Sequence, residues 1–362
     1  MQITNIVTYL APGTIYVKVE TDQGISGYGE CSRMGREALL PIINHFIFPA
    51  IQGLNPVDIE LIEHKVMLKN YKVSGQLLAM AFSGVEMALW EIKALLWEEP
   101  LFRLLGGKFR HTLPFYGSSM SRDLPAEQEA EKVTEAIERN GFEAVKIKVG
   151  PRMGTGELVD LSYDVHRVAV MRKTIGPNIK LMLDANSSYT YAQATQFFSR
   201  VMEYDIFHYE EPCPYYDVEA YVKLAQLPVP IHVGEQDWNI FTFRDFLSKG
   251  ACDLYAPDLV KCGGFLSAKR CAALCRAFGI IYAPHNTSRG LGLAATIQLA
   301  AATPECQYYY EYKIGQDPSE LYLERPFVIS DGNLSVPEGI GYGVKLDLEK
   351  MERTMTLVSA LG

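Results

Sequence analysis

The feature that most constrains the fold of this chain is a steady alternation of short apolar runs with helix-like stretches, which begins near Leu113. The runs are unbroken rather than alternating, as expected for parallel strands that are covered on both faces. They span residues 114–117, 144–150, 180–186, 206–212, 231–235, 254–258, 280–285 and 308–311. Eight such units over about 200 residues predict an α/β fold of the (β/α)8-barrel type.

A doubly wound parallel sheet is the competing topology for the same alternation. The first run is not followed by the Gly-x-Gly-x-x-Gly pattern that dinucleotide-binding sheets of this kind carry. Gly150, Gly154 and Gly156 also lack the Gly-Lys-Ser/Thr ending of a phosphate-binding loop. The sequence therefore favours the barrel and predicts no nucleotide site.

The segments on either side of these units have a different texture. Apolar residues alternate from Ile15 to Val19, and a turn at 22–24 leads to a second extended run at 25–30, which predicts a β-hairpin. Helical patterns follow over residues 36–97 and end at Pro100 and a Gly-Gly pair. Near the other end, apolar residues 327–329 and 334–336 flank Asp-Gly, which predicts a terminal hairpin that returns to the N-terminal segment.

Titratable side chains stand at the C-terminal ends of seven of the eight runs. They are Lys148, Asp184, Glu210, Glu235, Asp258, His285 and Glu311. The active sites of barrel enzymes lie at this end of the strands. We therefore expect the seven side chains to converge on one mouth of the barrel.

Three carboxylates, Asp184, Glu210 and Glu235, end three consecutive strands. Unpaired buried carboxylates at such close range repel one another and take up protons, so their coexistence indicates a hard divalent cation. Mg²⁺, completed by water and substrate oxygens, is the ion that this ligand set favours. The alternative gives each carboxylate a helix N-cap or an arginine partner.

Two further sets of residues suggest proton transfer. Lys146 and Lys148 point to the same face of their strand, so the charge of Lys146 is expected to lower the pKa of Lys148 and make it a usable base; the alternative is an ion pair with the acidic ring. Asp258 and His285 end neighbouring strands and can form a dyad, in which the carboxylate fixes the tautomer of the imidazole. A packed core histidine is the alternative for His285.

Composition excludes several classes of partner. With 34 Lys and Arg against 43 Asp and Glu, the formal net charge is −9, so no basic excess exists to bind nucleic acid. Seven cysteines without a C-x-x-C pair indicate reduced thiols and a cytoplasmic protein. The most apolar long stretch, 77–97, is interrupted by charges at helical spacing, and no signal peptide is recognisable, so no membrane association is expected.

The motifs together resemble the mandelate racemase subgroup of the enolase superfamily. The resemblance rests on Lys146-x-Lys148, Asp184 with Asn186, Glu210-Glu-Pro212, Gly234-Glu235, Pro257-Asp258-x-x-Lys261-x-Gly-Gly264, Pro284-His285 and Glu311. The N-terminal sequences Gly27-Tyr-Gly-Glu30, Ala88-Leu-Trp-Glu-Ile-Lys93 and Leu104-Leu-Gly-Gly107 are similar to the capping domain of that family. The resemblance thus covers nearly the whole chain.

The resemblance implies a modified (β/α)7β barrel with an α+β capping domain. It implies an N-terminal capping domain over residues 1–112, a catalytic barrel over 113–325 and a C-terminal segment, 326–362, that returns to the cap. It also implies a homo-oligomer, from a dimer to an octamer. Asp258 argues against the muconate cycloisomerase-like members, which carry a lysine at the matching position.

The resemblance further implies the roles of the site residues. Asp184, Glu210 and Glu235 would bind one Mg²⁺ per chain. Lys148 would serve one face of the substrate and the dyad of Asp258 and His285 the other. Glu311 would be a hydrogen-bond donor or electrophile toward the substrate carboxylate, and Lys146 would bind substrate oxygen.

This set of residues suits removal of the proton α to a carboxylate, because Mg²⁺ can stabilise the enediolate that results. We expect a sugar acid, an aldonate or aldarate, to be dehydrated to a 2-keto-3-deoxy acid. Either Lys148 or His285 takes the α-proton, and protonated His285 returns one to the leaving hydroxyl. The alternatives are a racemase or epimerase of a 2-hydroxy acid, a cycloisomerase of a sugar-acid lactone or anhydro-sugar acid, and a non-catalytic metal-stabilised binding protein.

The predicted lining of the site is polar. Arg152, Asn186 and Asn286 are the expected substrate-binding residues, together with Lys146 and Glu311. Such a lining suits a polyhydroxylated small-molecule acid. The segment from residue 8 to residue 16 is short, so we expect the capping loop at this position to be abbreviated.

Overall fold

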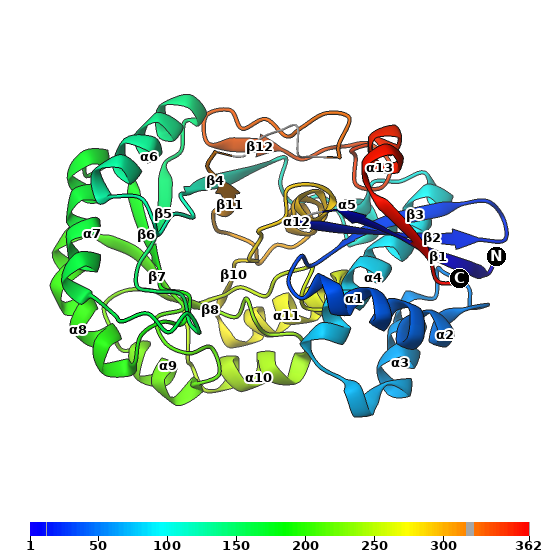
Figure 1. Cartoon of the computed structure of the whole chain (residues 1–362), viewed down its shortest axis with the longest axis horizontal. Coiled ribbons are helices and arrows are strands. Elements are labelled where there is room, and N and C mark those ends of the chain that lie inside the picture. Colours follow the sequence, from blue (N-terminus) through cyan, green and yellow to red (C-terminus); the bar gives the residue numbers. More distant parts are fainter. Residues whose placement is uncertain (12, 316–321, 362) are drawn as a thin grey trace.

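The computed structural model describes residues 1–11, 13–315 and 322–361, without the side chains of Ala11 and Thr14. Figure 1 shows two parts that lie side by side. A ring of strands is surrounded by helices α6 to α11, and a smaller sheet lies beside it together with both chain termini. The two parts correspond to the predicted barrel and the predicted cap.

The small sheet is antiparallel, with the strand order β13-β1-β2-β3. Its strands are β1 (Ile3–Ala11), β2 (Thr14–Thr21), β3 (Ser26–Cys31) and β13 (Thr356–Ser359). The pairing of β1 with β2 continues to Ala11 and Thr14. The chain termini meet in this sheet because β13 pairs with β1.

Helices cover one face of the small sheet. They are α1 (Arg36–Ile42), a π-helical turn (Ile43–Ile47), α2 (Phe48–Ile51), α3 (Ile59–Lys69), a 3-10 turn (Tyr71–Val73), α4 (Gln76–Trp97) and α5 (Leu101–Leu104). Strand β3 lies so close to α4 that a Cβ atom on Gly29 would approach Gly84 O to 1.9 Å. A side chain at Gly29 would therefore push the strand away from the helix.

The barrel is built from parallel strands in the order β10-β9-β8-β7-β6-β5-β4-β11. They are β4 (Thr112–Ser118), β5 (Ala144–Lys148), β6 (Lys180–Asp184), β7 (Ile206–Glu210), β8 (Ile231–Val233), β9 (Leu254–Tyr255), β10 (Ile281–Tyr282) and β11 (Tyr310–Lys313). Each falls on one of the eight predicted runs.

Seven α-helices alternate with these eight strands. They are α6 (Ala126–Asn140), α7 (Leu161–Ile175), α8 (Tyr191–Val201, continued by a 3-10 turn at Met202–Tyr204), α9 (Val218–Leu224), α10 (Ile240–Ser248), α11 (Phe265–Phe278) and α12 (Leu291–Ala301). The architecture is thus (β/α)7β, and the predicted fold class is confirmed. The predicted domain boundaries at 112/113 and 325/326 stay predictions.

The prediction that the terminal hairpin returns to the N-terminal segment is wrong. Residues 330 and 333 do form a bridge around the Asp-Gly turn, but β12 (Asn333–Ser335) pairs antiparallel with the start of β4 in the barrel. Leu334 is buried there, because the first residues of β4 offer an open edge and apolar cover. Two later segments return to the cap: Tyr342 donates hydrogen bonds to the carbonyls of Tyr28 and Met87, and β13, which follows α13 (Leu348–Thr354), pairs with β1.

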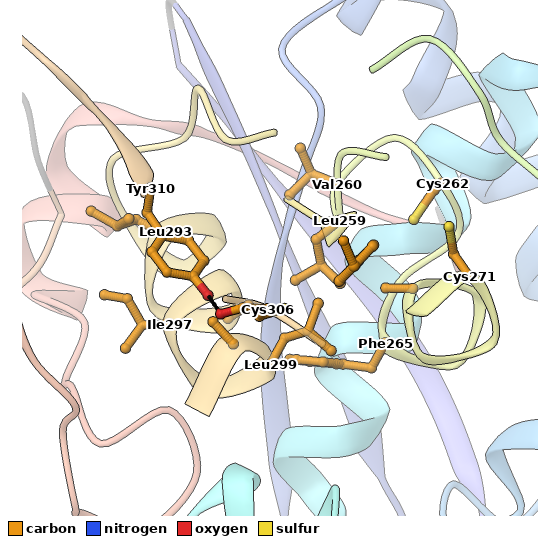
Figure 2. Packing of buried hydrophobic residues seen from close by; sticks show 14 of the residues in the cluster. Leu259, Val260, Cys262, Phe265, Cys271, Leu293, Ile297, Leu299, Cys306 and Tyr310 are labelled. Atoms are coloured by element: carbon orange, nitrogen blue, oxygen red, sulfur yellow. Dashed lines mark hydrogen bonds between the residues drawn. The ribbon is translucent and has the colours of Figure 1, made fainter. Parts of the chain in front are cut away.

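Apolar side chains fill the space between α11, α12 and the cap helix α4. Figure 2 shows Leu293 and Ile297 of α12 on one side of this core, with Leu259 and Phe265 from the segment that enters α11 on the other. Tyr310 of β11 donates a hydrogen bond to the carbonyl of residue 306 at 2.9 Å. All seven cysteines are buried and free of disulfides, as the spacing of the cysteines predicts.

Two buried carboxylates join the cap to the barrel. Glu86 of α4 accepts hydrogen bonds from the backbone N–H groups of Phe265 and Leu266, at 2.8 and 3.0 Å, where α11 begins. Glu30 of β3 accepts one from the N–H of Gly292, at 2.8 Å, where α12 begins. Burial raises the pKa of Glu86 to about 8. Because these side chains accept hydrogen bonds from N–H groups that have no partner within their own helix, the contacts align the cap with the two barrel helices.

Within the described part of the chain, no helix is both long and apolar enough to cross a bilayer.

Candidate active site

The seven strand-end side chains predicted to converge are all buried at the C-terminal mouth of the barrel. Their residues range from 0% exposed for Asp184 to 7% for Glu235 and His285. The register pairs Lys148 with Asp184 and Asp184 with Glu210, so neighbouring strand ends bring these side chains together.

Two of the three predicted metal ligands, Glu210 and Glu235, lie close together. Lys146 Nζ lies 2.6 Å from Glu210 Oε2 and 3.7 Å from Asp184 Oδ2, so these two carboxylates share a neighbour. Ligand atoms of Glu210, Glu235 and His285 all lie within 4.8 Å of one another. Asp184 is not in this close group, because its Oδ2 atom is engaged by the two lysines.

These residues fit a hard divalent cation. Carboxylate oxygens are the ligands that Mg²⁺ prefers. Among the described residues, both carboxylate oxygens of Glu311 and Oε1 of Glu211 are buried without a hydrogen-bond partner. Burial raises the pKa of Glu210, but the charges of Lys146 and His232 outweigh this effect, and its pKa lies well below the usual value. Glu210 is therefore in the ionised form that a metal ligand must have.

The two lysines of β5 form ion pairs with the acidic ring. Lys146 contacts Glu210 most closely, and Lys148 Nζ hydrogen-bonds to Asp184 Oδ2. Burial lowers the pKa of Lys146, but Glu210 and Glu311 hold it well above its ordinary value, so Lys146 is charged. The ion pair considered as an alternative is thus present, and the role of Lys148 as a base stays a prediction.

The structure brings Asp258 and His285 into contact. His285 Nδ1 lies 2.7 Å from Asp258 Oδ2, while its Nε2 lies 2.8 Å from Glu235 Oε2 and 3.7 Å from Glu311 Oε2. Burial lowers the pKa of His285, but Glu235 and the hydrogen bond to Asp258 raise it to about 10. Nε2 of the imidazole therefore faces the centre of the site, and Nδ1 is held by Asp258.

Glu311 lies between Lys146 and His285. Its Oε1 atom is 3.6 Å from Lys146 Nζ, and its Oε2 atom is 3.7 Å from His285 Nε2. Burial raises the pKa of Glu311, but the charges of Lys146, His285 and Lys148 produce a net lowering. Positively charged groups thus flank the Glu311 carboxylate on both sides of the mouth.

The predicted substrate-binding residues have different surroundings. Asn186 donates its backbone N–H to Asp184 Oδ1 at 2.8 Å and accepts from Arg122 at 2.8 Å, so it belongs to the rim of the carboxylate cluster. Asn286 is buried and donates to the carbonyl of residue 288 at 3.0 Å within its own loop. Arg152 is exposed. Substrate binding by these residues stays a prediction.

Lys261 and Glu211 are two further charged residues of the site. Lys261 Nζ lies 3.4 Å from Glu235 Oε1 and 4.0 Å from Asp258 Oδ2, so it neutralises both carboxylates. The spacing of Lys261, three residues after Asp258, was the sequence signal that could have indicated this contact. Strand alternation places Glu211 on the face opposite Glu210. Its backbone φ is +38°, and the strand ends here. Its carboxylate accepts a hydrogen bond from Ser187 at 3.4 Å.

Two histidines lie near Glu210 in the barrel, His208 two residues earlier on β7 and His232 beside it on β8. The rings of His208 and His232 have centroids 4.8 Å apart, and His232 Nδ1 lies 3.3 Å from Glu210 Oε2. His208 Nδ1 lies 2.9 Å from the hydroxyl of Tyr308. Burial lowers the pKa of His208 to about 4, so this ring is neutral. The two-residue spacing of His208 and Glu210 on β7 was the signal that places them on one face.

The comparisons with known proteins agree with this geometry. Residues 4–106 match the N-terminal domain described as mandelate racemase / muconate lactonizing enzyme, and residues 128–351 match the enolase C-terminal domain-like description. Fold and site together define a barrel protein with a cap and a carboxylate-lined mouth of the enolase type. The chain belongs to the mandelate racemase and muconate lactonizing enzyme family within the enolase superfamily.

Several named proteins are similar over almost the whole chain. The D-xylonate dehydratase of Haloferax volcanii is 31% identical, over 98% of this chain and 89% of its own. The D-galactarolactone cycloisomerase of Agrobacterium fabrum is 30% identical, over 93% and 90%. The crystal structure of the 3,6-anhydro-D-galactonate cycloisomerase from Zobellia galactanivorans is similar with a TM-score of 0.86, at 26% identity, over 98% of this chain and 100% of that chain.

Proposed function

We propose that this protein is a sugar acid dehydratase. It removes the proton α to the carboxylate of an aldonate or aldarate and expels the β-hydroxyl as water, which yields a 2-keto-3-deoxy acid. The observation that carries the proposal is the arrangement of Lys148 and the Asp258–His285 dyad around one cluster of buried carboxylates. The similarity to proteins named D-xylonate dehydratase and D-galactonate dehydratase supports this reaction.

The protein residues have distinct tasks in this reaction. Lys148 or His285 takes the α-proton, because each presents a nitrogen atom toward the mouth. Asp258 holds Nδ1 of His285, so Nε2 is the atom that exchanges a proton with the substrate. Protonated His285 then donates to the departing hydroxyl group. Lys146 and Glu311 orient the substrate carboxylate between the two bases.

Asp184, Glu210 and Glu235 would hold one Mg²⁺ per chain, with oxygen atoms that suit this ion. Bound there, the cation supplies electrostatic stabilisation of the negative charge that develops on the substrate carboxylate as the α-proton leaves. Lys261 keeps Glu235 oriented in the absence of substrate, because its Nζ lies 3.4 Å away.

A cycloisomerase reaction is the second candidate. It starts with the same proton removal but opens or closes a ring in a lactone or anhydro-sugar acid. The similarity to the D-galactarolactone cycloisomerase and to a 3,6-anhydro-alpha-L-galactonate cycloisomerase favours it. Return of the proton to the same carbon, as in a racemase or epimerase, would need the same two bases.

The test is a screen of mono- and diacid sugars and their lactones with Mg²⁺, in which keto-acid formation is measured. Dehydration of an open-chain acid supports the dehydratase. Keto-acid formation only from lactones or anhydro-sugar acids supports the cycloisomerase instead. Loss of optical rotation without a keto acid would favour an epimerase, and no change of any acid would contradict all three reactions.

Our remaining expectations concern the setting of the enzyme. Seven buried free thiols fit a reducing compartment, so we keep the cytoplasm as its location. A homo-oligomer, from a dimer to an octamer, is the expected assembly. We expect neither nucleic acid nor a membrane as a partner.

A further inference from the structure

His208 and His232 form a buried pair of imidazole rings that the proposed reaction does not use. His208 lies on β7 and His232 on the neighbouring strand β8, and the two residues are 0% and 4% exposed. The register places His232 directly beside Glu210. Two rings whose centroids are 4.8 Å apart thus meet in the interior of the barrel, next to one of the predicted Mg²⁺ ligands.

One nitrogen atom of each ring has a partner that fixes the position of its proton. His232 Nε2 lies 3.4 Å from the carbonyl oxygen of Ala283, which can only accept a hydrogen bond, so Nε2 carries the proton of the neutral ring. His208 Nδ1 lies 2.9 Å from the hydroxyl group of Tyr308, whose oxygen can accept from it. With these tautomers, His208 Nε2 and His232 Nδ1 each keep a free lone pair.

The two remaining nitrogen atoms both lie close to Glu210. His208 Nε2 is 3.7 Å and His232 Nδ1 is 3.3 Å from Glu210 Oε2. Among the described residues, neither nitrogen atom has a hydrogen-bond partner. Buried polar atoms without a partner are unfavourable, and nitrogen lone pairs beside a carboxylate oxygen repel it. A cation bound by all three atoms would remove both costs.

The distances suit a tetrahedral transition-metal site. Zn²⁺ binds histidine nitrogen and carboxylate oxygen at about 2.0–2.2 Å, so two ligand atoms of a tetrahedral site are about 3.3–3.6 Å apart. The two distances to Glu210 Oε2 are close to this range, and all three ligand atoms lie within 4.8 Å of one another. Imidazole suits Zn²⁺ and related ions, whereas Mg²⁺ prefers ligands that are all oxygen.

Lys146 shares the same carboxylate oxygen. Its Nζ lies 2.6 Å from Glu210 Oε2, with Asp184 at 3.7 Å and Glu311 at 3.6 Å as further counter-ions. A carboxylate oxygen has two lone pairs, so Lys146 and a cation can both bind Oε2. The two further carboxylates offset the repulsion between the ammonium group and such an ion.

We propose that His208 Nε2, His232 Nδ1 and Glu210 Oε2 bind a second divalent cation, Zn²⁺ or another ion that prefers imidazole, separate from the proposed Mg²⁺. The other oxygen atom of Glu210, Oε1, is not used by this site. Tyr308 is a positioning residue, because its hydroxyl group holds Nδ1 of His208 and leaves Nε2 for the ion.

The test measures the zinc bound per chain. Protein stripped of metal with a chelator is dialysed against Zn²⁺ with Mg²⁺ in excess, and bound zinc is determined by elemental analysis. We expect one Zn²⁺ per chain, and a loss of Zn²⁺ affinity of about tenfold or more in His208→Gln and in His232→Gln. His64→Gln, at an exposed position on α3, is the control and keeps the affinity of the unaltered protein. Absence of bound zinc would overturn the site.

A second measurement locates the ion, because Glu210, Glu235 and His285 form another group that could take Zn²⁺. Anomalous scattering at the zinc edge, from crystals of the unaltered protein with Zn²⁺ and Mg²⁺, is expected to place the ion between His208 and His232. We also expect His285→Asn to keep the bound zinc. A zinc peak beside His285 instead, or zinc lost with His285→Asn and kept by His208→Gln and His232→Gln, would overturn the site.

Tyr308→Phe tests the site without removing a ligand. The substitution deletes only the hydroxyl group that orients His208, and we expect Zn²⁺ affinity to fall by about 10- to 100-fold. Unchanged affinity would contradict the positioning role of Tyr308.

The outcome is independent of the reaction type. If zinc binds between the two histidines but no acid forms a keto acid, the second metal site stands and the dehydratase proposal fails. If keto acid forms with Mg²⁺ and no zinc is bound, the dehydratase stands and the second metal site fails.

Discussion

At the scale of single residues, the site depends on how each charge is paired. The imidazole of His285 is held between Asp258 and Glu235, at 2.7 and 2.8 Å, and Lys148 is hydrogen-bonded to Asp184. The two groups proposed to transfer protons thus enter from different segments, β5 and the residues after β10, toward one cluster of carboxylates. Their separate contributions can be measured by substitution.

Replacing Lys148 by methionine removes the amine and keeps the approximate length of the side chain. We expect keto-acid formation to fall by about 10²- to 10⁴-fold, the usual contribution of a positioned acid or base. Steady-state assays with Mg²⁺ measure the loss, and Lys173→Met, at an exposed position on α7, is the control. Activity within a few-fold of the unaltered protein would remove Lys148 from the mechanism.

Replacing Asp258 by asparagine tests the dyad. The amide can still accept a hydrogen bond from Nδ1, but it no longer stabilises positive charge on His285. We expect a loss of about 10²-fold or more in turnover, with little change in Mg²⁺ affinity. Parallel measurements of activity and of metal binding separate the two effects. A matching loss of metal binding would show that Asp258 acts on the ligand set rather than on His285.

At the scale of elements, the sequence predicted the order of the barrel strands and the convergence of their ends. It could do so because parallel strands covered on both faces are apolar throughout, and because strand ends meet at one mouth. It could not predict where β12 pairs, since a short hairpin of alternating residues fits any open strand edge.

The joint between α4 and α11 is an element-scale feature that can be tested. Glu86 accepts hydrogen bonds from three N–H groups, including that of the Trp90 indole at 2.8 Å. Glu86→Gln replaces one of its two acceptor oxygens by an NH2 group, which then faces an N–H donor instead of accepting from it. We expect the free energy of unfolding to fall by about 1–3 kcal/mol. Thermal denaturation measures the change, with Glu98→Gln, at the exposed position that follows α4, as the control. Equal melting temperatures for the two variants would contradict a structural role of Glu86.

At the scale of the whole molecule, the mouth is closed by two parts of the chain that are distant in sequence. The cap holds the barrel through Glu30 and Glu86, and Gln76 at the start of α4 donates to the carbonyl of Gln236, after β8, at 2.9 Å. The carboxylates that form the site therefore depend on the packing of the complete fold. Binding of an ion to them is expected to stabilise the molecule as a whole.

Removal of divalent cations with a chelator is expected to abolish activity and to lower the melting temperature. Addition of Mg²⁺ at 100 times its dissociation constant stabilises the folded state by about 2.7 kcal/mol. Thermal denaturation with and without Mg²⁺ measures this effect, and Asp184→Asn is expected to reduce it strongly. A shift of the same size in Asp184→Asn would show that the ion binds elsewhere.

The central claim is that Lys148 or His285 takes the proton from the carbon next to a carboxylate and that protonated His285 donates a proton to the departing hydroxyl group. The most direct measurement follows a sugar acid in D₂O with Mg²⁺ by proton NMR. For the unaltered protein, the account predicts a 2-keto-3-deoxy acid that carries solvent deuterium at carbon 3, and neither this product nor α-proton exchange when Lys148→Met and His285→Asn are combined. Full exchange or turnover by the double variant, or none by the unaltered protein with any acid, would contradict it.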